Sequence, residues 1–334
     1  MKKALLFLLP ILIGGLYFLL EHSKEKVATP FNIQKELKKK ANKEYLEKNI
    51  QQELNSHKLY EAKTLINLAT FLKVDINKSL IQKFQEENSS FKQIIYQSKE
   101  FLNGFITGKI NSTASLVGSF SSDFSLIGDI RDIYYEGNRY LNHQEYNKLI
   151  LSLSLAGVAL SIGAIPSFGA TLPLKAATAT LKGASKNRYL TKDFQSVLEK
   201  KLSKSIHLQQ LKQIDLSSIE ALKKDQKKLS KLVEFKHIKP ILNSLATITK
   251  NTSTLDTIKI MRFIHSEKEL HKAALITKKY KKNSYGLFKV LKRDIFRGVK
   301  FVFKKGILYF TILFLITILF IIWLFTLLSF IKRA

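Results

Sequence analysis

The sequence predicts an all-α integral membrane protein with N- and C-terminal transmembrane helices, a central apolar helix or hairpin, and helical extramembrane domains. Three runs without a charged residue carry this prediction, at positions 4–20, 149–174 and 307–331. About 20 apolar residues suffice to cross a bilayer as a helix. Between the runs, apolar residues recur every three or four positions, which is the period of an amphipathic helix.

The composition narrows the function classes. The chain of 334 residues contains no cysteine, which excludes disulfides, thiolate metal sites and cysteine catalysis. Its seven histidines are scattered and lie in no zinc-protease, nucleophile-elbow or phosphate-loop pattern, so we predict neither an enzyme nor a cofactor. The net charge of +29 comes mostly from lysine. Only seven arginines are present, and a lysine-rich surface with few arginines gives little base recognition, so a nucleic-acid partner is not expected.

Positions 1–20 predict a signal anchor or transmembrane helix. Lys2 and Lys3 precede 17 uncharged residues, as in a secretory signal. No small-residue cleavage site follows, which favours an uncleaved anchor over a cleaved signal peptide. The two lysines place the N-terminus in the cytoplasm.

Positions 21–90 predict a helical-hairpin extramembrane region. Pro30 is well placed in the first turn of a long helix that extends to about position 50. A second helix is expected over 59–72. A third follows Asp75, a residue type that favours the N-cap, and runs through 78–87.

Positions 91–148 form a Gly/Ser-rich membrane-proximal region that ends in an acidic, aromatic helix. The motif residues of that helix are Gly128, Asp129, Arg131, Asp132 and Glu136. The three carboxylates share one helix face, where they could bind a cation. We favour pairing with Arg131, Arg139 and Lys148 and with the positive end of the helix dipole, so no metal is predicted.

Positions 149–182 predict a central apolar transmembrane segment or hairpin. Small residues that let helices approach closely in lipid form a stripe of Ser152, Ala156, Ala159 and Gly163. In one geometry 149–165 crosses and the rest is an exit loop. In a second, 149–165 and 170–181 dip in and return as a hairpin. In a third, the run is a buried core helix of a soluble domain.

The chain after the central run is strongly basic. Positions 183–305 hold 30 Lys and Arg against 10 Asp and Glu, whereas 21–147 hold 18 against 16. We predict a basic helical domain over 183–286, a basic amphipathic helix over 287–306 and a transmembrane helix over 307–331. The side chains expected to lie on anionic lipid headgroups are Lys289, Lys292, Arg293, Arg297, Lys300, Lys304 and Lys305.

Two topologies fit these segments. Positively charged flanks stay in the cytoplasm, which places both the N-terminus and 183–305 inside. The central run then crosses, and 21–147 lie outside. In the competing topology, 21–305 all lie outside and both ends are cytoplasmic. We favour the model with three crossings.

The chain resembles a group of proteobacterial membrane proteins of unassigned function that share a Gly-Asp-x-Arg-Asp motif, an Ala/Gly-rich apolar run and a Leu-Pro-x-basic exit. The matching positions are Gly128, Asp129, Arg131, Asp132, Gly137, Gly157, Leu172, Pro173, Lys175 and Lys182. The segment is also similar to the pre-toxin segments of bacterial polymorphic toxins. The resemblance implies the bacterial inner membrane and no catalytic residue.

From these patterns we expect a non-enzymatic inner-membrane protein that acts as a scaffold or partner-binding platform. Its expected partners are a bilayer with anionic headgroups and a protein, either a second copy of the chain or another. The alternative is a membrane-active, pore- or transport-related protein that oligomerises through the central small-residue helix.

Overall fold

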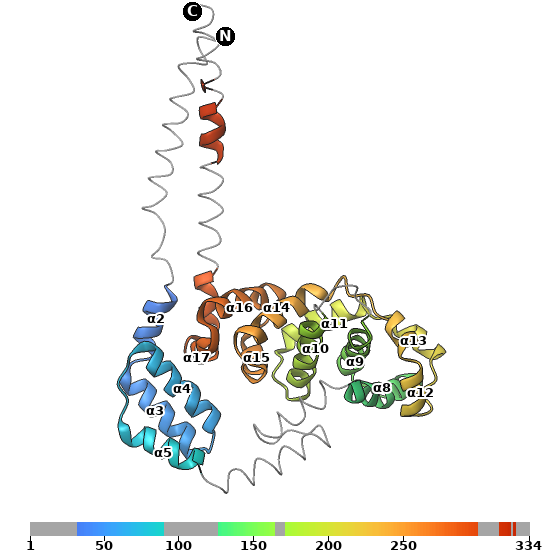
Figure 1. The fold of residues 1–334 in the computed structure, drawn as a ribbon, viewed down its shortest axis with the longest axis horizontal. Helices are drawn as coiled ribbons and strands as arrows, with labels where there is room; N and C mark the ends of the chain where they lie inside the picture. Colours follow the sequence, from blue (N-terminus) through green and yellow to red (C-terminus); the bar gives the residue numbers. More distant parts are fainter. Residues whose placement is uncertain (1–31, 90–125, 164–170, 300–313, 322, 325–334) are drawn as a thin grey trace, which may run out of the picture. The chain divides into compact units, whose positions relative to one another are not determined.

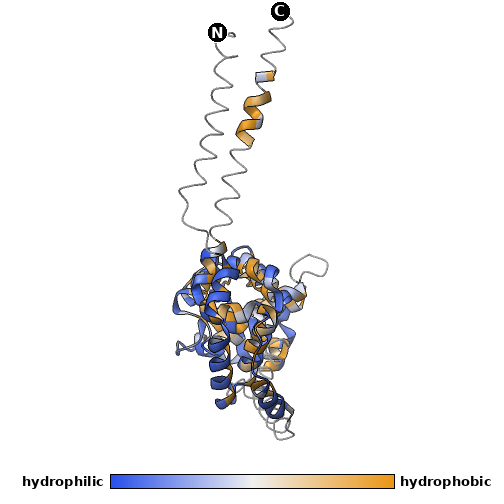
Figure 2. Cartoon of the chain, turned by 90° about the vertical axis from the view of Figure 1, so that its left-hand side faces the viewer, coloured by the Kyte–Doolittle hydropathy of each residue, from blue (hydrophilic) through white to orange (hydrophobic). Residues whose placement is uncertain are grey.

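A computed structural model describes residues 32–89, 126–163, 171–299, 314–321 and 323–324 (Figure 1). Within these ranges every regular element is a helix, which confirms the all-α fold class. The chain forms two units. The unit called here the first unit comprises 37–293, and the second unit comprises 1–36 with 294–334. Figure 2 shows hydrophilic residues over much of the first unit, whereas the described helical piece at 314–321 is apolar.

The N-terminal helices are α2 (Ile33–Lys40), α3 (Lys43–Asn55), α4 (Leu59–Leu72) and α5 (Lys78–Ser89). The expected long first helix is two helices, because the side chain of Asn42 accepts a hydrogen bond from the Tyr45 amide and starts α3 anew. At α5, Asn77 and not Asp75 takes the capping role, with its Oδ1 accepting from the Ser79 amide at 3.0 Å.

The central helices are α8 (Leu126–Leu141), α9 (Lys148–Ser161) and α10 (Thr171–Lys186). Helix α9 packs between α8 and α10 and also contacts α11 and α13 (Figure 1). Every side chain from Leu149 to Leu160 is buried. An all-round apolar helix is expected where protein surrounds it on every side.

This packing corrects the prediction of a transmembrane segment or membrane hairpin at 149–182. At about 1.5 Å per residue, the 14 residues of α9 rise only about 21 Å, less than the roughly 30 Å of bilayer hydrocarbon. No described helix combines the length and apolar character that a membrane crossing needs. The role predicted for the small-residue stripe, close helix packing in lipid, is corrected as well. Ser152, Ala156 and Ala159 are buried inside the chain, whereas Gly163 lies beyond the helix end with a φ of +74°.

The remaining helices form the basic half of the first unit. They are α11 (Lys192–Ser203), α12 (Ile219–Lys224), α13 (Gln226–Lys231), α14 (Lys239–Asn251), α15 (Thr254–Ile260), α16 (Glu267–Tyr280) and α17 (Ser284–Leu291), with 3₁₀ turns η1 (Leu208–Gln213), η2 (Met261–Phe263), η3 (Lys281–Asn283) and η4 (Lys292–Asp294). Helix α14 packs on both α10 and α16, so it joins the central helices to the C-terminal ones.

The amphipathic helix predicted over 287–306 is interrupted. Helix α17 ends at Leu291, and Lys292 turns the chain with a φ of +49°. Lys289, expected on lipid headgroups, is instead paired with carboxylates of α3 and α4. Arg293 pairs with Glu269 at 2.7 Å, and Arg297 lies 3.7 Å from Asp294. The other lysines assigned to the lipid surface, at 300, 304 and 305, fall outside the described residues, as does the run at 1–20.

Contacts within the first unit also rule out the favoured topology with three crossings. The Tyr60 hydroxyl donates to Asp256 at 2.7 Å, and Lys259 pairs with Glu61. These partners come from opposite sides of the central run. They cannot meet if 21–147 and 183–305 lie on opposite sides of a membrane.

Candidate functional site

Two aspartates and two lysines form an ion cluster between α8 and α10, here called the Asp–Lys cluster, in which every member except Lys186 is buried. The Nζ atom of Lys182 lies 2.7 Å from an oxygen of Asp129 and 2.8 Å from an oxygen of Asp132. Lys186 Nζ lies 3.0 Å from the same Asp132 oxygen. The spacing explains the geometry: residues three apart on α8 share a face, and so do residues four apart on α10.

Burial makes the Asp–Lys cluster energetically critical. The Lys182 side chain is 0% exposed, and Asp129 and Asp132 are 2% and 7% exposed. Burial by itself raises the pKa of Asp132, but Lys182 and Lys186 outweigh it and lower that pKa to about 2. Arg131 adds to this effect, with its guanidinium 3.1 Å from Asp132. The carboxylate is therefore held ionised inside the protein, where it depends on its cations.

Gly157 of α9 makes room for this cluster. A Cβ atom at position 157 would lie 2.3 Å from Asp129 Oδ2, closer than real contacts allow. Ser154, one turn earlier, has its hydroxyl 3.4 Å from Asp132. Helix α9 thus packs against the cluster that α8 and α10 form. Its small residues at 154 and 157 leave space for the two aspartates of α8.

Glu136 is not part of the Asp–Lys cluster. Its carboxylate accepts from the Asn147 backbone amide at 2.7 Å and lies 3.4 Å from Arg139, so it fastens the turn between α8 and α9. The sequence placed its three carboxylates on one face, but the structure separates Glu136 from the other two. Across the described ranges, no group of three or more His, Asp or Glu side chains is arranged to hold a metal ion.

A second network, here called the Glu61 cluster, is partly buried and joins α4 to α15 and α17. Glu61 pairs with Lys259, accepts from the Tyr285 hydroxyl at 2.8 Å, and accepts from Lys289 at 2.9 Å. Lys289 reaches Glu53 on α3 as well, at 2.6 Å. Residues more than 190 positions apart are linked in this way, so the cluster closes the first unit.

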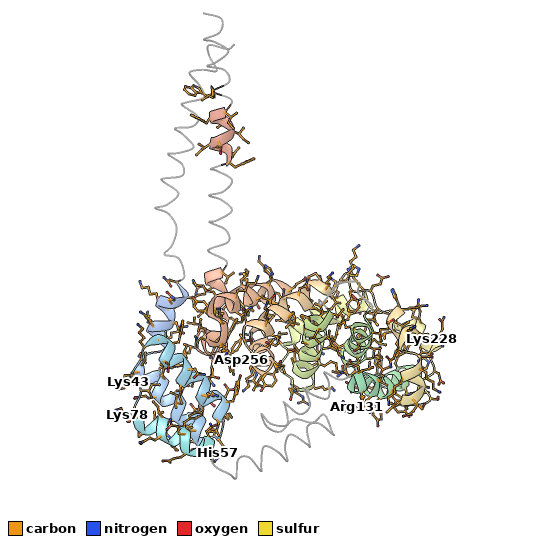
Figure 3. The ribbon with its side chains drawn as sticks, viewed as in Figure 1. Lys43, His57, Lys78, Arg131, Lys228 and Asp256 are labelled. Atoms are coloured by element: carbon orange, nitrogen blue, oxygen red, sulfur yellow. The ribbon has the colours of Figure 1, made fainter. Side chains whose placement is uncertain are left out.

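Tyr60 and Asp256 extend the Glu61 cluster through a hydrogen bond between them. Asp256 is labelled in Figure 3. Besides donating to Asp256, Tyr60 places its ring 4.6 Å from Lys259 Nζ. Burial raises the pKa of both the Tyr60 hydroxyl and the Asp256 carboxyl. Ser253 caps α15 through the Asp256 amide, so the local fold of the α14–α15 turn aims Asp256 at α4.

Acid should weaken the fold through Glu61. Burial alone raises the pKa of Glu61, but Lys259 and Lys289 lower it from 4.5 to about 2. A carboxyl with a depressed folded-state pKa stabilises the protein above its unfolded pKa, and that contribution disappears as the pH falls toward the folded value. We expect Glu61 to contribute about 3 kcal/mol at neutral pH, lost mainly between pH 5 and 2. Denaturant unfolding of the full chain in detergent across this range measures it.

The comparison with Glu61→Gln isolates this contribution. At pH 7 the variant should be clearly less stable than the natural chain, and the difference should narrow as the pH falls. Glu220→Gln, at an exposed position of α12, is the matched control and should follow the natural chain throughout. A constant gap between Glu61→Gln and the natural chain from pH 7 to 3 would contradict the assignment.

Sequence reasoning found part of these clusters. Asp129 and Asp132 stood out by their helical spacing, and Lys182 through the resemblance. Two expected partners do pair with the acids, Arg131 with Asp132 and Arg139 with Glu136. The lysines that hold the two aspartates, Lys182 and Lys186, were not expected as their partners. The Glu61 cluster was missed, since nothing local marks Glu61 as buried. Its one sequence signal is an acid within the apolar-rich α4. In both clusters acids and bases neutralise each other, which suits them to holding helices together.

Comparison with protein-family models, curated proteins and solved structures finds no match for this chain.

Proposed function

We propose that this chain is a non-enzymatic protein of the bacterial inner membrane, in which a helical domain over 37–293 is a scaffold or partner-binding platform. Runs 1–20 and 307–331 tether it to the bilayer. The supporting observation is that the central apolar run is buried inside the domain. The two terminal runs are then the apolar segments that remain for contact with lipid. In the described part of the last run, large apolar side chains are exposed, among them Phe314, Phe320 and Ile321.

The proposal has a definite topology. The first unit forms one packed body, so residues on both sides of the central run share a compartment. Since Lys2 and Lys3 hold the start in the cytoplasm, the domain lies on the outer face and both ends are cytoplasmic. Long translocated segments cross largely regardless of charge, which accommodates the lysine surplus of the domain.

Reporter fusions after residues 100, 240 and 334 test this topology. We expect the first two to report the outer compartment and the third to report the cytoplasm, because the proposed crossings lie in runs 1–20 and 307–331. Fusion of the same reporter after residue 2 is the cytoplasmic control. Opposite compartments for 100 and 240 would restore a central crossing and refute the proposal.

The platform role is tested by recovering partners. The full chain, solubilised in detergent after crosslinking in cells, should retain a specific protein, either another copy of itself or a second component. A chain that remains a monomer with no stoichiometric partner would refute this role.

The pore-forming alternative has less support. It requires the small-residue stripe of α9 to face other copies of the chain, and the stripe residues 152, 156 and 159 are buried against helices of the same chain. Conductance across planar bilayers containing the full chain would favour it.

A further inference from the structure

Four exposed lysines surround a buried tyrosine where α16 ends. Lys278 and Lys279 lie in the last turn of α16, and Lys281 and Lys282 open η3. Tyr280, between the two pairs, is 5% exposed and packs edge-on against Phe71 of α4 at 6.4 Å between ring centroids. The tyrosine therefore fixes the segment to α4, while the four lysines beside it stay exposed.

The same place exposes an aromatic ring. Phe71, near the C-terminus of α4, is 39% exposed, and Lys73 at the helix end is exposed as well. Helix α4 contacts η3 directly. The result is one surface, here called the lysine–phenylalanine surface, that consists of Phe71, Lys73, Lys278, Lys279, Lys281 and Lys282.

The charge of this surface is not balanced locally. Positions 270–293 contain eight Lys and Arg and no Asp or Glu. Of these eight, Lys289 is neutralised by Glu53 and Glu61, and Arg293 by Glu269. In the part of the chain that the structure describes, none of the four lysines around Tyr280 pairs with a carboxylate. Favourable interaction with the helix dipole accounts for the pair in the last turn, but not for the pair beyond it.

We propose that the lysine–phenylalanine surface docks on anionic lipid headgroups. Clustered lysines attract an anionic membrane surface, and an exposed aromatic ring enters the interface between headgroups and acyl chains. This inference rests on the proposed membrane tethering. It replaces the lipid contact expected at Lys289 with one at the end of α16.

The length of the intervening chain supports a lipid partner over a soluble polyanion. Only 24 residues separate Lys282 from the start of the apolar run at 307. Even fully extended, at about 3.5 Å per residue, they would reach no further than about 84 Å, so the proposed tether confines this surface to the neighbourhood of a bilayer. A diffusing acidic protein or nucleic acid has no such advantage in local concentration.

The test uses a fluorophore that shifts its emission in apolar surroundings. The chain has no cysteine, so Thr70→Cys gives one labelling site, at an exposed position next to Phe71. The labelled full chain is reconstituted into vesicles that are neutral or contain roughly 30% anionic lipid. We expect a shift to shorter wavelength with anionic lipid, reversed at about 0.5 M NaCl, which screens charges beyond a few ångströms.

A matched pair of variants identifies the lysines responsible. Glutamine at 278, 279, 281 and 282 should abolish the shift. Glutamine at 223, 224, 227 and 231, four exposed lysines of α12 and α13, makes the same charge change and should leave the shift intact. Circular dichroism checks the fold of both. The salt reversal requires no lysine variant, so it decides the matter even if one variant misfolds.

Three results would overturn the inference. The first is an equal shift in neutral vesicles, and the second is a shift that survives loss of the four lysines. The third is the same shift on adding duplex DNA without vesicles, which would assign the surface to nucleic acid. Flotation distinguishes the two proposals. A full chain that floats with vesicles but shows no shift refutes only the docking surface, whereas a chain that does not float refutes the tethering as well.

Discussion

Replacing Lys182 with alanine should destabilise the helical domain by about 3–5 kcal/mol, because it leaves two buried carboxylates without their shared cation. The free energy of unfolding of a native domain is roughly 5–15 kcal/mol, so this loss is a large fraction of the total stability. Lys186 remains near Asp132, but Asp129 loses its 2.7 Å partner. Denaturant unfolding of the full chain in detergent, followed by circular dichroism, measures the loss.

The control for this experiment is Lys192→Ala at an exposed position of α11, which should change stability by less than about 0.5 kcal/mol. A compensated variant separates charge from packing. Lys182→Met combined with Asp129→Asn and Asp132→Asn removes the three fully or nearly fully buried charges together and leaves only Lys186 and Arg131, which reach solvent. This variant should recover much of the stability. A loss below about 1 kcal/mol in Lys182→Ala would show that water reaches the aspartates and that the cluster is not dry.

Gly157→Ala should be nearly as damaging, although it adds one methyl group. That group would lie 2.3 Å from Asp129 Oδ2 and 2.6 Å from its Cγ, so α8 and α9 must separate or the aspartate must leave Lys182. Overpacking a core costs about 1–3 kcal/mol, and weakening a buried ion pair adds to that. We expect a loss of about 3 kcal/mol or more in the same unfolding assay.

Gly163→Ala is the matched glycine control. Nothing lies within 4 Å of a Cβ at that position, and its φ of +74° costs alanine only backbone strain, about 1–2 kcal/mol. If the clash with Asp129 causes the damage, Asp129→Ala in the Gly157→Ala background should cost less than it does in the natural chain. Additive losses would contradict that cause.

The local helices could be predicted because their signals are local. Helix α4 occupies the expected 59–72, and α16 occupies 267–280, since apolar periodicity and capping residues act within a few positions. The breaks were missed where a single polar side chain decided them, as at Asn42. Within the basic domain predicted over 183–286, a break of the same kind separates α12, which ends before Asp225, from α13, which begins after it.

The central run shows why the site could only be partly predicted. An uncharged, small-residue helix has the same composition whether lipid or protein surrounds it, and the sequence-based preference for lipid was wrong for α9. The Asp–Lys cluster decides between them, because a buried lysine on α10 pairs across α9 with α8. That pairing joins residues more than 50 positions apart, beyond the reach of any periodic pattern.

By itself, the sequence determined the helical class, the positions of most helices and the existence of apolar terminal runs, because these depend on interactions between near neighbours. Only the tertiary structure decided that the central run is buried, that Lys182 and Glu61 are the centres of ion clusters, and that the domain closes on itself. Those outcomes depend on which distant side chains exclude water together, and burial of a charge acquires its energetic consequence only when its partner is in place.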